Sequence, residues 1–132
     1  MTYAEFKEKQ RKEFEAFPMF FAFNQKQLDD GLKKLNVTVK EIYRLPGGGF
    51  IRKTDSKAFG AMLDKLDKEK KNLLSDPKNL TNAIEYELAN HEYCFTCDET
   101  EALEAVGVKL DSEEKIECFK KARQRYMASC TF

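Results

Sequence analysis

Apolar residues recur along this chain with a helical period over most of its length and gather in a few short unbroken runs. The longest helical pattern covers residues 56–74. Similar patterns predict helices from Thr2 to Pro18, from Asn24 to Asn36, from Pro77 through Leu88, from Asp98 to Gly107, and from Asp111 or Ser112 through Met127. Aromatic and β-branched runs predict strands at 19–23, 42–45, 50–53 and 93–96, the first of them buried on both faces.

The stretch from Glu41 to Asp55 is the one around which we expect the fold to be organised. Its two strands flank the run Pro46–Gly49. Proline fixes one turn angle and glycine tolerates positive φ angles, so this run predicts a β-hairpin with a four-residue loop. The segment Thr54–Ser56 then offers an N-cap for the longest helix.

Together these elements predict an α+β fold with a small antiparallel or mixed sheet of about four short strands, packed with about six helices. The chain has 132 residues and is 42% hydrophobic, which suffices for one core. We therefore expect a single globular domain over residues 1–132.

Charge is distributed unevenly along the chain, although the formal net charge is zero. A zero net charge argues against a general nucleic-acid binder. Residues 79–114 carry ten acids and one base. We interpret these acids mainly as partners of helix dipoles, and the alternative is an acidic face for a basic partner.

The N-terminal residues lack the apolar core of a signal peptide, and the aromatic run 17–23 is far shorter than the roughly 20 residues of a membrane span. We therefore expect a cytoplasmic protein without a membrane partner. Its four cysteines do not indicate a disulfide framework. Cys94 and Cys97 form a C-x-x-C pair, but on a strand they would point to opposite faces, and a second pair is absent. We expect buried, inert thiols, no metal and no cofactor.

The glycine triplet 47–49 with Arg52 and Lys53 is the first candidate site. A strand separates these glycines from the next helix, so they form neither a phosphate-binding loop nor a dinucleotide fingerprint. The hairpin tip is either scaffold or a binding surface for a partner or ligand.

His91 is the single histidine, and Glu87 precedes it by one helical turn. Stabilisation by this carboxylate and by a helix C-terminus explains such a histidine without catalysis. General acid–base catalysis would need a nucleophile and a pocket, so we assign no catalytic residue. If strands 50–53 and 93–96 are neighbours, the basic residues would lie near His91, Glu92 and Tyr93, in a patch that suits a protein interface or a small anionic ligand. The candidate binding residues are Gly47, Gly48, Gly49, Arg52, Lys53, Asp55, His91, Glu92 and Tyr93.

Three segments resemble a family of small uncharacterised proteins from phages and other mobile elements of Firmicutes: FFAFN at Phe20–Asn24, GGGFIRKTDS at Gly47–Ser56 and YELANHEYC at Tyr86–Cys94. The resemblance extends to about Val108. The family pattern often has tyrosine in place of the second cysteine, so Cys97 departs from it, which weakens a zinc or redox role further. The resemblance implies an accessory role, such as blocking a host defence protein, sequestering a defence signal or regulating replication.

We therefore expect a non-enzymatic, anti-CRISPR type inhibitor in the host cytoplasm that docks on a host defence protein such as a CRISPR effector nuclease. The alternative is a protein that holds a nucleotide-like signal near Gly47–Lys53. A third possibility is an enzyme that uses His91 and Glu92.

Overall fold

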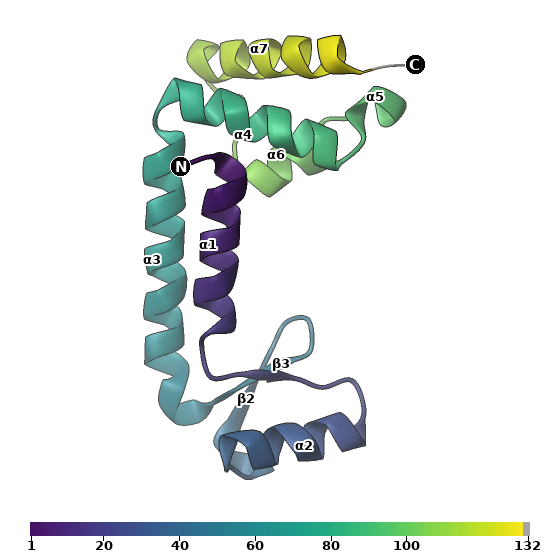
Figure 1. The fold of residues 1–132 in the computed structure, drawn as a ribbon. Coiled ribbons are helices and arrows are strands. Elements are labelled where there is room, and N and C mark those ends of the chain that lie inside the picture. The colour runs from purple at the N-terminus through teal and green to yellow at the C-terminus, as the bar shows by residue number, and fades with distance from the viewer. Residues whose placement is uncertain (131–132) are drawn as a thin grey trace. The chain divides into compact units, whose positions relative to one another are not determined.

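The computed structural model of this protein describes residues 1–130, and it has the predicted α+β class (Figure 1). In chain order its elements are α1 (Tyr3–Glu15), β1 (Phe20–Phe21), α2 (Gln25–Leu35), η1 (Val39–Glu41), β2 (Ile42–Leu45), β3 (Gly49–Arg52), η2 (Lys53–Asp55), α3 (Ser56–Leu74), α4 (Pro77–Asn90), α5 (Tyr93–Thr96), α6 (Thr100–Val106) and α7 (Glu113–Ser129).

The residues of the chain divide into two compact units, each with most of its contacts inside itself, and we describe the two units separately. The helical unit comprises Met1–Lys7 and the chain from Lys68 onward, and the sheet unit comprises Glu8–Asp67. The expectation of a single globular domain over residues 1–132 stays a prediction.

The sheet unit contains an antiparallel three-stranded sheet in the order β1-β3-β2. The helix α2 packs against this sheet. Gly31 permits the contact because it has no side chain, and a Cβ at this position would lie 2.0 Å from the ring of Phe20. Phe20 in turn stacks on Phe50 of β3, with ring centroids 5.2 Å apart. Buried side chains of this unit are Met19, Phe20, Leu35 and Ile51.

The prediction of a strand at 19–23 buried on both faces was wrong in its length and its burial. Only Phe20 and Phe21 pair with β3, and they form an edge strand. Phe21 is 51% exposed and Phe23 is 75% exposed. An edge strand with one covered face buries alternate residues, so an apolar run does not by itself show burial on both sides.

The core of the helical unit lies where α4 meets α6 and α7 (Figure 1). Ala83, Ala102 and Ala122 have no exposed surface and bring one small side chain from each of these helices to the contact. Small side chains let helices approach closely, and the larger Ile84 and Leu88 then fill the space between them without exposure.

The prediction of a strand at 93–96 was wrong, because Tyr93–Thr96 forms the one-turn helix α5. Glu92 before it and Cys97 after it both have left-handed backbones, with φ of 53° and 54°. The Cys97 N–H donates to the carbonyl of Tyr93 at 2.8 Å, which closes the turn. Aromatic composition favours strands only where a neighbouring strand is available, and here packing on the helical core replaces it.

No helix between residues 1 and 130 is long and apolar enough to cross a membrane.

Candidate functional site

The hairpin loop is shaped by glycines that the sequence singled out. Gly47 and Gly48 have φ of 84° and 87°, a region that side chains other than glycine rarely adopt. Leu45 pairs with Gly49, so the loop has three residues rather than the predicted four. A Cβ on Gly48 would lie 2.5 Å from the ring of Phe23. The missing side chain at Gly48 therefore makes room for the ring of Phe23, a residue of this same chain.

Arg52 and Lys53 both have partners within the sheet unit. The Arg52 guanidinium donates to the Asp55 carboxylate at 2.7 Å, across the short helix η2. The Lys53 ammonium lies 5.3 Å from the centre of the Tyr43 ring, a cation–π distance. Asp55 thus holds the side chain of Arg52, one of the two basic residues that follow the hairpin loop.

Three exposed aromatic residues lie around the hairpin, and we call them the aromatic edge: Phe21, Phe23 and Tyr43. Phe21 pairs with Gly49, and Gly49 also pairs with Leu45. Leu45 follows Tyr43 by two residues on the same strand. Directly paired residues share a face of the sheet, as do residues two apart, so Phe21 and Tyr43 lie on one face. Tyr43 is 49% exposed. Phe23 covers the loop beside them.

The other predicted residues lie at the junction of α4 and α5 in the helical unit. The His91 N–H caps α4 by donating to the Glu87 carbonyl at 2.9 Å. Its imidazole Nδ1 lies 3.3 Å from the Glu101 carboxylate of α6, so the predicted pairing with the Glu87 side chain was wrong. Glu92 is exposed, and the Tyr93 ring lies 6.3 Å from that of Tyr126.

The structure therefore places the predicted residues in two groups, one in each unit. The proposed link between them rested on a strand at 93–96 beside strand 50–53. Since residues 93–96 are helical, that strand pairing does not exist.

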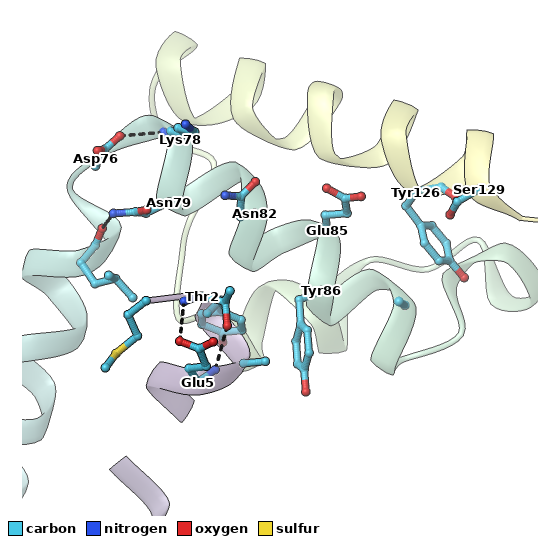
Figure 2. A pocket seen from close by; sticks show the side chains of 15 residues that line it. Thr2, Glu5, Asp76, Lys78, Asn79, Asn82, Glu85, Tyr86, Tyr126 and Ser129 are labelled. Carbon is cyan, nitrogen blue, oxygen red and sulfur yellow. Dashed lines mark hydrogen bonds between the residues drawn. The ribbon is translucent and has the colours of Figure 1, made fainter. Parts of the chain in front are cut away.

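A groove of about 940 Å³ opens on the helical unit, between the start of α1, the exposed side of α4 and the end of α7 (Figure 2). Figure 2 shows Asn79, Asn82 and Tyr86 succeeding one another along α4, with Tyr126 and Ser129 contributed by α7. Amides, tyrosines and the carboxylates of Glu5 and Glu85 line this groove, so it offers hydrogen bonds to a polar occupant.

A buried charge cluster lies beside the groove. Glu87 has no exposed surface, and its carboxylate accepts hydrogen bonds from the Tyr3 hydroxyl at 3.4 Å and from the Lys7 ammonium at 3.2 Å. The Lys7 ammonium also lies 5.4 Å from the Tyr86 ring centre. Burial, and then the Glu87 carboxylate, raise the pKa of Tyr3 above its usual value. Tyr3 and Tyr86 line the groove, so the contacts of this cluster hold two of the lining side chains in place.

Sequence reasoning missed Tyr3 and Lys7, and it gave Glu87 the wrong partner. Thr2 and Glu5 form a capping box at the start of α1, with bonds of 3.3 and 3.1 Å, and such a box depends only on neighbouring residues. Nothing local, however, shows which distant residue meets the first helical turn. The spacing of Tyr3 and Lys7, one turn apart on a single face, was the available signal.

The cysteines do not gather into a metal site. Within residues 1–130, no group of three or more His, Cys, Asp or Glu side chains is arranged to hold a metal ion. Cys97 is exposed, Cys118 is buried, and Cys94 and Cys130 are half-buried. The expectation of buried thiols was therefore wrong for Cys97, which lies at the exposed end of the turn α5.

Comparison with the curated proteins and with the solved structures finds no match to this chain. One family model does match, that of the family of unknown function DUF7659, and the match covers residues 2–129. This confirms the expectation of an uncharacterised family and extends it beyond Val108, through the last helix. The chain belongs to the DUF7659 family.

Proposed function

We propose that this chain is a non-enzymatic binding protein that engages a protein partner through the aromatic edge of the sheet unit. The observation that carries the proposal is the exposure of Phe23, which leaves three quarters of its surface in solvent beside the half-exposed Phe21 and Tyr43. Exposed aromatic clusters are costly in water, and aromatic residues dominate the energetic centres of protein interfaces.

The neighbouring charges support a protein partner over a small anionic ligand. Arg52 and Lys53 already contact Asp55 and Tyr43, so an anion would have to compete with these contacts. A protein partner requires no such exchange, because it buries the rings and leaves the charges at the rim of the interface. A nucleotide-like signal near Gly47–Lys53 remains the second candidate.

More specifically, we propose that this protein belongs to a phage or mobile element and blocks a defence protein of the host. It is supported by the resemblance of three segments to proteins of such elements, and two of these segments, Phe20–Asn24 and Gly47–Ser56, surround the aromatic edge. An inhibitor of this kind blocks its target by occupying a surface and needs no catalytic residue. The partner would be a host defence protein such as a CRISPR effector nuclease.

The test measures DNA cleavage by a panel of purified CRISPR effectors with increasing amounts of this protein. Phe23→Ser and Lys53→Glu should keep the fold while weakening inhibition, by about 1–3 kcal/mol if the side chain is a central contact. Phe95→Ser is the matched control, because Phe95 is exposed to the same degree, at 76% against 75% for Phe23, but lies on α5 of the helical unit.

Inhibition that is lost in Phe23→Ser and kept in Phe95→Ser supports the proposal. The reverse pattern would place the working surface on the helical unit, near the acidic stretch 85–104. No inhibition of any effector, together with a thermal shift by a nucleotide, would favour the ligand-binding alternative.

A further inference from the structure

The strand β2 forms one edge of the sheet, because the strand order is β1-β3-β2. Adjacent side chains of a strand point to opposite faces, and both Tyr43 and Arg44 are exposed. Around these two residues, β2 therefore has solvent on both faces of the sheet as well as an edge without a neighbouring strand.

The register shows which backbone groups of β2 point to this open edge. The Ala22 N–H donates to the Gly48 carbonyl at 3.0 Å, next to the pairs that join β1 to β3. Alternate residues of a central antiparallel strand bond towards the same neighbour, so Gly48 and Phe50 both bond towards β1. Arg44 pairs with Phe50, and Ile42 lies two residues before Arg44. The N–H and C=O groups of Arg44 and Ile42 therefore point away from the sheet, and within residues 1–130 no backbone hydrogen bond reaches them.

The chain around β2 is strongly basic. Residues 31–54 carry six bases and a single acid, Glu41. The Glu41 carboxylate is already engaged, because it accepts hydrogen bonds from the Thr38 backbone N–H at 3.1 Å and from the Thr38 hydroxyl at 3.0 Å. A partner of complementary charge for this edge is acidic.

We propose that β2 receives an extended, acidic segment of the partner protein, which adds to the sheet as a further strand. This pairing presupposes the protein partner proposed above and describes how that partner is held. The segment bonds through its backbone to Ile42 and Arg44. Its acidic side chains lie on the face of Arg44, and the residues between them pack on the opposite face, beside the ring of Tyr43.

A second copy of this chain suits the edge less well than an acidic segment does. Pairing β2 with β2 would bring the same basic stretch against itself, and like charges on paired strands are destabilising. Charged residues on edge strands commonly prevent such self-association. A nucleic acid would also meet positive charge here, but it has no peptide backbone with which to continue the ladder.

The first experiment titrates the protein with a short peptide that alternates glutamate and valine, and it follows amide hydrogen exchange by NMR. The exchange of the Arg44 and Ile42 amides should slow by at least about tenfold at saturation, because both gain a hydrogen bond. The amides of Tyr43 and Leu45 should change less, since they already bond to β3. A peptide with lysine in place of glutamate, and one with proline in place of its central valines, should not bind.

The second experiment compares Arg44→Ala with Arg44→Pro. Both remove the charge, but only proline also removes the outward N–H, and an edge strand tolerates proline where the N–H faces solvent. We expect Arg44→Ala to weaken peptide binding by about threefold to tenfold. Arg44→Pro should weaken it by roughly a further fivefold. Lys26→Ala is the control and should bind as the wild type does, because Lys26 is an exposed base of α2, which packs at β1 on the opposite edge.

The proposal fails if the acidic peptide does not slow exchange at Arg44, if the lysine peptide binds as tightly, or if single-stranded DNA of the same charge binds in place of the peptide. Slow exchange at Arg44 in the free protein, rising with its concentration, would instead assign the edge to a second copy. The wild-type exchange decides the matter, so poor folding of a variant leaves the result readable.

Failure of this pairing is distinguishable from failure of the proposed function. Inhibition that depends on Phe23, without peptide binding at β2, would retain the aromatic edge and overturn the added strand. Peptide pairing at β2 without inhibition of any effector would support the added strand and count against the anti-defence role.

Discussion

The ammonium of Lys7 lies 3.2 Å from both carboxylate oxygens of Glu87, a side chain with no exposed surface. The two residues are 80 positions apart, and their contact joins the first turns of α1 to α4 within the helical unit. A buried carboxylate is costly unless cations and hydrogen-bond donors surround it. Tyr3 and Asn90 supply two further donors, each at 3.4 Å.

We expect Lys7→Met to lower the free energy of unfolding by about 1–3 kcal/mol, because Glu87 would lose its cation. Combining it with Glu87→Gln should cost less than the sum of the two single changes, since the pair would be removed together. Urea denaturation measures both effects. Lys9→Met is the control, because it removes a lysine that is 49% exposed from a pair with Glu13 at 3.9 Å, and the expected loss is below about 0.5 kcal/mol. Equal losses for Lys7→Met and Lys9→Met would contradict the assigned role of Glu87.

A second prediction concerns alkaline pH. The Cys94 side chain, and then burial, raise the pKa of Tyr126 to about 12, from an ordinary value of 10. A group whose pKa is higher in the folded state stabilises the protein fully below its unfolded pKa, and this contribution is lost as pH rises. Stability should therefore fall between about pH 10 and 12, and more gently in Tyr126→Phe.

Denaturation at a series of pH values measures this fall, and tyrosine absorbance follows the ionisation directly. Below pH 10 the wild-type protein and Tyr126→Phe should show no difference in the slope of stability against pH. An equally steep fall in Tyr126→Phe above pH 10 would show that another group is responsible.

Local sequence signals predicted much of the fold. The helix predicted at 56–74 is α3 with the same bounds. Gly107 ends α6 with a left-handed backbone, and Asn24 and Ser112 cap α2 and α7 through their side chains. Each of these features depends on residues within one or two helical turns of each other, which a sequence displays directly.

The features that were missed depend on distant residues. Tyr93–Thr96 has the composition of a strand, but contact with Tyr126 of α7 makes a helical turn the better packed state. The Lys7–Glu87 pair joins segments whose spacing carries no signal. In the candidate site, the hairpin and its glycines were predictable, whereas the placement of Phe23 over Gly48 was not.

The third prediction concerns metal. We expect the purified protein to carry no stoichiometric zinc and to keep its melting temperature in a chelator. The original reason, opposite faces of a strand, no longer applies, because Cys94 and Cys97 lie on a helical turn. The reason now is that Cys94 packs against the helical core while Cys97 is exposed, so the two thiols lack a common centre. Elemental analysis giving about one zinc per chain, with unfolding in chelator, would overturn this prediction.

The last prediction compares three glycines by the space beside each of them. Gly48→Ala should lower the free energy of unfolding by about 1–2 kcal/mol, because a side chain is strained at φ 87° and would collide with the Phe23 ring. Gly31→Ala should cost more, since its Cβ would lie 2.0 Å from the buried ring of Phe20.

Gly60 gives the opposite expectation and serves as the internal control. It lies in the exposed interior of α3, and a Cβ there would meet nothing within 4 Å. Gly60→Ala should therefore raise the free energy of unfolding by about 0.5–1 kcal/mol, because alanine favours the helix over the unfolded chain. Urea denaturation of the three variants should give the stability order Gly60→Ala, wild type, Gly48→Ala, Gly31→Ala. A Gly48→Ala variant as stable as the wild type would contradict both the strain assigned to the left-handed backbone at Gly48 and a fixed position of the Phe23 ring.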